Sequence, residues 1–129
     1  KIKKVLKNKI NNKKICILGV SYKENVGDLR SSPSLNFINK CIREGAKIYW
    51  HDPFVNDISI KKATKIKSLI KFKNFDAVVF AVKHDQYKKI NFLKKNVKNS
   101  IIFDSNYILS SLQLNQIVKN KIKFKSIGR

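Results

Sequence analysis

The sequence predicts an α/β domain built on an open, mainly parallel sheet of about five strands, with helices on both faces. Short apolar runs rich in Ile, Val and Phe alternate along the chain with segments whose apolar residues have helical spacing. The first run, Lys14–Val20, is typical of a strand covered on both faces. A polar loop, Ser21–Ser31, follows it. This loop is expected at the carboxyl end of a strand, where open parallel sheets bind ligands.

The first predicted helix begins directly after this loop. Ser32 can cap it with its side-chain oxygen, and Pro33 suits its first position because no N–H is needed there. Gly45 can close it in a left-handed conformation. Its apolar residues are Leu35, Phe37, Ile38, Cys41 and Ile42. A strand is expected next at Lys47–His51, and strand, helix and strand in this order form a right-handed crossover unit.

The rest of the chain continues the alternation of strands and helices. Further strands are expected at Asp76–Val82, at Ile101–Asp104 and, on the edge of the sheet, at Lys121–Ile127. A polar loop is expected at Lys83–Gln86. Helices are expected near Ile66–Ile70, near Ile90–Val97, and at Tyr107–Lys119 with Asn106 as the cap. Residues 1–12 have helical spacing and are predicted to end a connecting helix, so that 13–129 forms the domain.

The length of 129 residues is enough for one domain. Apolar runs fall well short of the roughly 18–20 residues of a membrane span, and the basic start lacks the apolar segment of a signal peptide. A cytoplasmic location is therefore expected. A chain that opens within a helix, without Met, is expected to be a fragment of a longer protein. Cys16 and Cys41 occupy apolar positions, which predicts buried thiols and neither a disulfide framework nor a metal site.

A net charge of +21 leaves two functional classes open. Clustered cations release counterions from a phosphate backbone, which would suit a stand-alone basic module that binds nucleic acid or another polyanion. However, nearly all the cations are Lys, whereas contacts to base edges and bidentate phosphate contacts favour Arg. The lysines are also spread along the whole chain. A solvated Lys-rich surface, without a specific nucleic-acid partner or a membrane, is the favoured interpretation.

Residue types and spacing alone do not reveal a catalytic centre. A dinucleotide-binding turn needs G-x-G-x-x-G after the first strand, and this chain has only Gly19 there. A P-loop, a His-Glu metal cluster and a Ser-His-Asp set singled out by spacing are also lacking, so no catalytic or metal site is predicted. His51 and His84 are interpreted as packing or solvent residues, and Trp50 as a core or interface residue.

The loop after the first strand carries the best candidates for ligand binding. Lys23 is expected near the crevice, where its ammonium can meet an anionic ligand, and Arg30 just before the helix can add a bidentate donor. The alternative is an Asp28–Arg30 pair that only stabilises the loop, with Lys23 solvated. Asp52 is expected to make a turn, and Asp104, at another strand end, is expected to have a functional role or to anchor the next turn.

With these residues in view, the run Ile17–Val55 resembles the start of the C-terminal domain of the nucleotide-sugar 6-dehydrogenases, the UDP-glucose and GDP-mannose dehydrogenase family. The residues that match the family pattern are Ile17, Leu18, Gly19, Ser21, Tyr22, Lys23, Asn25, Val26, Asp28, Arg30, Ser32, Pro33, Gly45, Ala46, Asp52 and Pro53. The segments YKENV and HDPFV look most like the branch that acts on UDP-N-acetylhexosamines. The later segments DAVVFAVKHDQY and IIFDSN fit the family's final strands.

The resemblance implies part of an NAD-dependent enzyme that oxidises the C6 alcohol of a UDP-sugar to a carboxylate in two hydride transfers, for surface-polysaccharide synthesis. It implies a Rossmann-like fold for this domain, which would hold the nucleotide of the sugar donor. A separate N-terminal domain would supply the dinucleotide fingerprint, most of the NAD site and the catalytic cysteine. The full-length protein is expected to be a homodimer, and this chain alone is expected to be inactive, with no catalytic residue of its own.

The resemblance also implies site residues. Tyr22 and Lys23 match the aromatic-Lys pair that contacts the UDP-sugar, and Arg30 matches the arginine that reaches the NAD cofactor across the domain cleft. Asn106 stands where many members have an arginine that contacts the nucleotide, and it can donate a hydrogen bond but brings no charge. Ser31 replaces a usual acidic residue. A degenerate domain retained for packing or oligomerisation is a further alternative.

Overall fold

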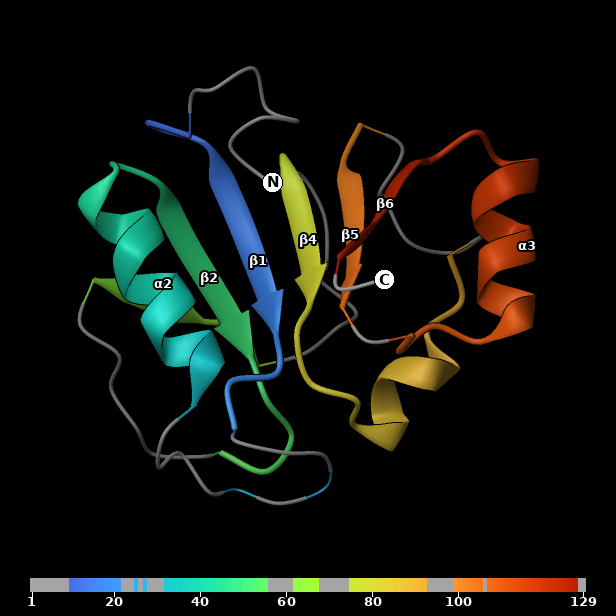
Figure 1. Ribbon diagram of the computed structural model, residues 1–129, viewed down its shortest axis with the longest axis horizontal. Coiled ribbons are helices and arrows are strands. Elements are labelled where there is room, and N and C mark those ends of the chain that lie inside the picture. The colour runs from blue at the N-terminus through green and yellow to red at the C-terminus, as the bar shows by residue number, and fades with distance from the viewer. Residues whose placement is uncertain are drawn as a thin grey trace.

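The computed structural model describes residues 10–21, 25, 27, 32–55, 62–67, 75–92, 99–105 and 107–127. Within them, six parallel strands form one sheet in the order β3-β2-β1-β4-β5-β6, with β1 between β2 and β4 (Figure 1). Along the chain the strands are β1 (Lys14–Leu18), β2 (Lys47–His51), β3 (Ala63–Lys65), β4 (Ala77–Phe80), β5 (Ile101–Ser105) and β6 (Lys123–Ile127). This is the strand order of a Rossmann-like doubly wound sheet, so the predicted fold class is confirmed.

The register of β1 decides which loops meet at the carboxyl edge of the sheet. Leu18, at the end of β1, pairs with His51 of β2 and with Phe80 of β4. The three strands therefore end at the same level. The segments that follow them, although far apart in the sequence, lie side by side at one edge of the sheet.

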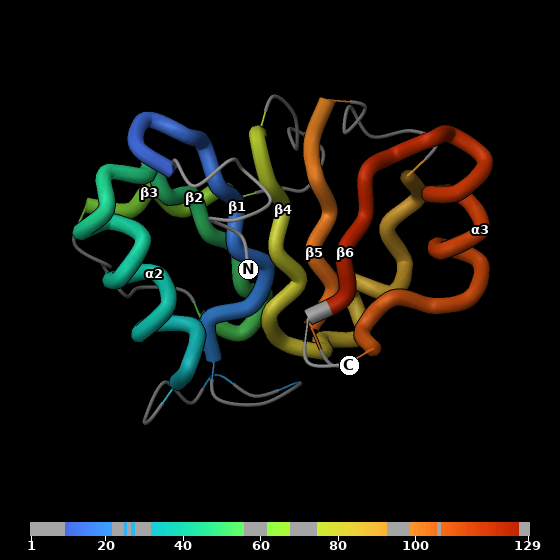
Figure 2. Tube along the Cα trace, turned by 45° about the horizontal axis from the view of Figure 1, so that its top comes forward, coloured from blue at the N-terminus to red at the C-terminus, as the bar shows by residue number. Residues whose placement is uncertain are grey.

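Alternate residues of the strands point to opposite faces of the sheet and build two hydrophobic cores. In β1, Ile15 and Ile17 belong to one core, whereas Cys16 and Leu18 belong to the other. The helical segments are α2 (Pro33–Arg43), the short 3-10 helix η2 (Asp85–Lys89) and α3 (Ser111–Lys119). α2 packs on the first core, and η2 and α3 pack on the second, so helices cover both faces as predicted (Figure 2).

Helix α2 has the ends that the sequence predicts. Its N-cap Ser32 accepts the Leu35 N–H at 3.4 Å and donates its own hydroxyl hydrogen to the Val20 carbonyl oxygen at 2.6 Å. After its last turn, Gly45 adopts a φ of +91°, which glycine tolerates without strain. The hydroxyl of Ser32 therefore ties the start of α2 to the chain that leaves β1, at the carboxyl edge of the sheet.

The predicted start of the last helix is wrong. α3 begins at Ser111, and its cap is Ser110, not Asn106. Ser110 accepts the Gln113 N–H at 3.2 Å, while the Gln113 side chain accepts the Ser110 N–H at 2.9 Å. This reciprocal capping box satisfies two backbone donors at once, which a lone Asn cap does not achieve.

Other segments also differ from their predicted secondary structure. β3 was not predicted, because its three residues are half-buried or exposed and form no apolar run. η2 occupies 85–89, partly where a loop was expected. Of the expected helices near Ile66–Ile70 and Ile90–Val97, the described residues 66–67 and 90–92 are not helical, and the others lie outside the described residues. Residues 1–9 of the expected connecting helix also lie outside them, and residues 11–12 form a turn.

Candidate functional site

A buried carboxylate joins three loops at the carboxyl edge of the sheet. Asp52 directly follows β2 and is 2% exposed. Its Oδ2 accepts the N–H of Val20 at 2.9 Å, the N–H of Ser21 at 3.1 Å and a hydrogen bond from His84 Nε2 at 2.9 Å. Its Oδ1 accepts the Phe54 N–H at 2.8 Å, which makes the turn that the sequence predicts. The loops after β1, β2 and β4 are thus held on one side chain.

The contacts of Asp52 keep it ionised. Burial by itself raises the pKa of the carboxyl group, but the hydrogen bonds from His84 and from the N–H groups of Phe54 and Val20 outweigh burial and lower the pKa to about 2. A fixed negative charge therefore lies beneath the loop that follows β1.

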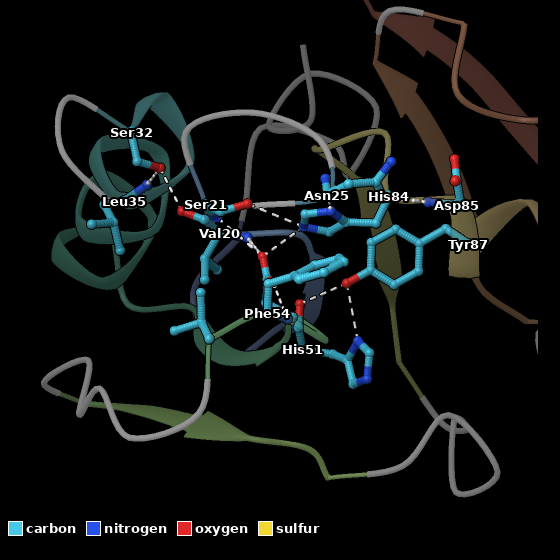
Figure 3. Close-up of polar contacts among 12 residues, drawn as sticks. Val20, Ser21, Asn25, Ser32, Leu35, His51, Phe54, His84, Asp85 and Tyr87 are labelled. Carbon is cyan, nitrogen blue, oxygen red and sulfur yellow. Dashed lines mark hydrogen bonds and ion pairs between the residues drawn. The ribbon is translucent and has the colours of Figure 1, made fainter. Parts of the chain in front are cut away.

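His84 takes part in this network through both ring nitrogens. Nδ1 accepts the backbone N–H of Asn25 at 2.8 Å, so the ring hydrogen is assigned to Nε2. Nε2 then donates to Asp52, and Ser21 Oγ lies 3.1 Å from the same nitrogen (Figure 3). Because the hydroxyl and the carboxylate meet the same nitrogen, and Ser21 is fully buried, these three residues do not form a nucleophilic triad.

A second buried pair fixes the end of β2 to η2. The Tyr87 hydroxyl donates to the His51 carbonyl oxygen at 2.9 Å and accepts from His51 Nδ1 at 3.0 Å (Figure 3). Burial lowers the pKa of His51, although the Asp52 charge opposes the shift, and burial raises the pKa of Tyr87. Both side chains are therefore uncharged hydrogen-bonding groups near neutral pH.

Asp104 plays a similar part at the end of β5. Its side chain is fully buried. Oδ1 accepts the Ile108 N–H at 2.9 Å and Oδ2 accepts the Leu109 N–H at 3.2 Å. The interpretation of Asp104 as the anchor of the next turn is confirmed, and the turn that it closes spans residue 106.

A small basic hollow opens beside the ends of β2 and β3. It has a volume of about 260 Å³ and is lined by His51, Asp52, Pro53, Lys65, Lys67 and Gln86. The Lys65 ammonium donates to the Val55 carbonyl oxygen at 2.9 Å and lies 5.3 Å from the centre of the Trp50 ring. Trp50 itself is buried in the core, as predicted.

The ligand-binding candidates Tyr22, Lys23, Arg30 and Asn106 lie outside the described residues, as does Asp28. The structure does place the neighbours of the first two. Ser21 and Asn25, on either side of residues 22–24, both contact His84. In the described part of the chain, no group of three or more His, Cys, Asp or Glu side chains is arranged to hold a metal ion. None of the helices described there is long and apolar enough to cross a membrane.

The turn after β1 does not fit a dinucleotide. In a dinucleotide-binding domain the backbone N–H groups of this turn face a pyrophosphate. Here the N–H groups of Val20 and Ser21 donate to the Asp52 carboxylate. Gly19 also packs against Val82, with a φ of +100°. The Asp52 carboxylate thus occupies the N–H donors that would contact a bound pyrophosphate.

Sequence reasoning missed the network of Asp52 and His84. It interpreted His84 as a packing or solvent residue. The packing alternative is confirmed, because the ring is fully buried, but its hydrogen bonds to Asn25 and Asp52 were not predicted. A signal was available, because Ser21, Asp52 and His84 each lie within four residues of the end of a predicted strand. Once β2, β1 and β4 are known to be neighbours, these three side chains must lie close together.

The strand order defines a Rossmann-like domain. The N–H groups of its first turn are occupied by the Asp52 carboxylate and are not free for a dinucleotide. The family model described as the UDP binding domain of the UDP-glucose/GDP-mannose dehydrogenase family matches residues 16–111. The chain therefore belongs to the UDP-glucose/GDP-mannose dehydrogenase family and contains its UDP binding domain.

The chain is also similar to individual relatives in sequence and to solved structures in fold. The UDP-N-acetyl-D-mannosamine dehydrogenase of Methanocaldococcus jannaschii is 35% identical over 115 residues, which cover 85% of this chain and 26% of that protein. The crystal structure of an NDP-N-acetyl-D-galactosaminuronic acid dehydrogenase from Methanosarcina mazei superposes with a TM-score of 0.80 at 23% identity, over 98% of this chain and 27% of that one. A UDP-D-ManNAc dehydrogenase from Pyrococcus horikoshii superposes with a TM-score of 0.73 at 27% identity, over 98% of this chain and 28% of that one. The chain spans about a quarter of the length of these relatives.

Proposed function

We propose that this chain is the nucleotide-sugar-binding domain of an NAD-dependent UDP-sugar 6-dehydrogenase. The enzyme would oxidise the sugar C6 alcohol to a carboxylate in two hydride transfers, in the cytoplasm, for surface-polysaccharide synthesis. A separate N-terminal domain would bind most of the NAD and supply the catalytic cysteine, and the full-length protein would be a homodimer. This chain alone would then be inactive, because its part is to bind and orient the UDP-sugar.

One observation carries the proposal: two buried carboxylates hold the loops in which the candidate residues lie. Asp52 accepts the N–H of Ser21, which directly precedes Tyr22 and Lys23. Asp104 accepts the N–H groups of Ile108 and Leu109, which close the turn that spans residue 106. Both loops follow parallel strands at the carboxyl edge, where such sheets bind ligands.

The candidate residues have complementary roles in this proposal. The Lys23 ammonium would meet the diphosphate of the UDP-sugar, and the Tyr22 ring would pack against the nucleotide. Asn106 would donate a neutral hydrogen bond in place of the arginine of other members. Arg30 would reach the NAD held by the other domain. The closed turn after β1 supports this division, because the described residues there do not fit a dinucleotide.

Isothermal titration of the full-length native protein with UDP and with UDP-N-acetylglucosamine tests the proposal. Lys23→Ala removes one charge-assisted contact to the diphosphate and is expected to weaken binding about 10- to 100-fold. Lys47→Ala is the matched control. Lys47 is an exposed lysine at the amino end of β2, on the opposite edge of the sheet, so its removal is expected to change the dissociation constant by less than about 2-fold.

Two outcomes would contradict the proposal. No binding of either ligand at millimolar concentration would exclude a nucleotide-sugar site. Equal weakening in Lys23→Ala and Lys47→Ala would show that affinity follows the net charge of +21 and not a site, as expected of a module for polyanions.

A further inference from the structure

One imidazole contacts the chain on both sides of residues 22–24. The Ser21 hydroxyl oxygen lies 3.1 Å from His84 Nε2, and the Asn25 N–H donates to His84 Nδ1 at 2.8 Å. Asn25 is held a second time, because its side-chain oxygen accepts the Asp85 N–H at 3.2 Å. In general, fixing both ends of a short segment lowers the conformational entropy that the segment loses when it binds a ligand.

The imidazole is itself fixed in place. Its Nε2 donates to the Asp52 carboxylate at 2.9 Å. The ring lies near two aromatic rings, with centroids 5.0 Å from Phe54 and 5.6 Å from Tyr87, and it is fully buried (Figure 3). A side chain held by contacts at both nitrogens and beside two rings keeps one orientation. The backbone that it anchors is therefore held firmly as well.

We propose that His84 is a positioning residue for nucleotide-sugar binding, which acts by accepting the Asn25 N–H at Nδ1 and donating to Asp52 at Nε2. The inference rests on the proposed function, because it requires Tyr22 and Lys23 to contact the ligand. It assigns to an internal residue, far from them in the sequence, the task of fixing the loop in the conformation that binds.

The acceptor role requires that Nδ1 carries no hydrogen, because two N–H donors cannot share a 2.8 Å contact. The ring hydrogen on Nε2 is in turn held by the Asp52 carboxylate at 2.9 Å. The two nitrogens therefore have different roles, which different substitutions can separate.

Two amide variants separate the two nitrogens. In His84→Asn the amide group reaches the position of Nδ1, so its oxygen can accept the Asn25 N–H, but the bond to Asp52 is lost. In His84→Gln the amide nitrogen reaches the position of Nε2 and keeps the donor to Asp52, but the acceptor for Asn25 is lost. The amide exchange rate of Asn25, measured by NMR, reports the anchor without any ligand.

The dissociation constant for UDP-N-acetylglucosamine is measured in the full-length native protein and both variants under the same conditions. His84→Gln is expected to lose Asn25 protection and to bind about 10-fold more weakly, and His84→Asn is expected to recover most of that loss.

The outcomes separate this inference from the function on which it rests. Loss of Asn25 protection in His84→Gln with unchanged affinity would overturn the positioning role and leave the proposed function intact. Equal weakening in both variants would also overturn it. Failure of wild type to bind at all would overturn both proposals together.

Discussion

The ring of His84 donates a hydrogen bond from Nε2 to the Asp52 carboxylate across 2.9 Å, between two residues that follow different strands. Both side chains are buried, at 0% and 2% exposure. A buried carboxylate is stable only when its oxygens are hydrogen-bonded, and Asp52 meets this need with donors from three loops. The backbone of Val20 and Ser21, directly after β1, is therefore held by one buried carboxylate.

Asp52→Asn is expected to destabilise the fold by about 2–4 kcal/mol, because the new amide group turns a donor toward N–H groups that Oδ2 now accepts. Urea unfolding measures the loss. Asp76→Asn is the matched control, since the Asp76 carboxylate accepts the exposed Lys14 N–H at 2.8 Å and an amide oxygen can replace it. Its expected cost is below about 1 kcal/mol. Equal losses of unfolding free energy in the two variants would contradict the role given to Asp52.

Acid should unfold the protein partly through the same carboxylate. The pKa of Asp52 lies at about 2 in the folded chain against an ordinary value of 3.8, so the folded state binds this proton more weakly. Its contribution to stability, roughly 2 kcal/mol, is complete above about pH 4 and is lost as the pH falls towards 2. Unfolding free energies measured across this window should fall more steeply in wild type than in Asp52→Asn. Parallel curves would contradict the lowered pKa.

His51 should add a second pH dependence at milder acidity. Burial lowers its pKa below the ordinary 6.5, so its contribution to stability is complete above that pH and decreases as the unfolded chain takes up the proton. Wild type should therefore lose stability between about pH 7 and pH 5. His51→Asn keeps a donor for the Tyr87 hydroxyl but does not titrate, so its stability should change less over this range. Thermal unfolding at several pH values in this range tests this, and an unchanged slope would contradict it.

The elements with strong local signals were predicted from the sequence. β2 has the predicted bounds, Lys47–His51, because apolar residues there are framed by a glycine turn and Asp52. α2 was predicted because Ser32 and Pro33 specify its start through short-range contacts. β3 carries no such signal, since it is recognised only by its pairing with β2. The start of α3 was misplaced because Asn106 and Ser110 both suit a cap, and only the partner Gln113 decides between them.

The buried network depended on information that is not local. Asp52 and His84 are 32 residues apart, and they meet because β2 and β4 are both neighbours of β1. Before the order of the strands is known, a histidine after a strand has no defined partner. Asp104 was easier to interpret, since the Ile108 and Leu109 N–H groups that its carboxylate accepts lie within five residues of it.

Gly19→Ala is expected to cost about 3 kcal/mol or more, because two independent constraints act at this residue. Its φ is +100°, and an added Cβ would lie 2.8 Å from the backbone nitrogen of Val82, which cannot move without shifting the end of β4. Gly45→Ala is the matched control. Its φ of +91° is similar, but the new Cβ would meet mainly the side chain of the exposed Asn11, which can rotate away. Guanidinium unfolding should give a cost of about 1–2 kcal/mol for this control. A larger loss in Gly45→Ala than in Gly19→Ala would contradict the argument.

The buried side chain of Gln113 connects α3 to η2 through hydrogen bonds. Its side-chain nitrogen donates to the carbonyl oxygens of Tyr87 at 2.8 Å and of Ile90 at 3.0 Å, and its side-chain oxygen accepts the Ser110 N–H. Gln113→Glu keeps the size and the acceptor but places a carboxylate oxygen against two carbonyl groups. The free energy of unfolding is expected to fall by about 3 kcal/mol, and urea unfolding near neutral pH measures this loss.

Gln116→Glu is the control for this exchange on the same helix. Gln116 uses its side-chain oxygen to accept the Phe92 N–H at 3.0 Å, and a carboxylate can accept it equally well. The free energy of unfolding is expected to change by less than about 0.5 kcal/mol in this control. The loss in Gln113→Glu should also shrink as the pH falls and the new carboxyl group is protonated, because a neutral acid can again donate to one of the two carbonyl oxygens. A loss that stays constant down to about pH 4 would show that shape, and not the missing donor, is responsible.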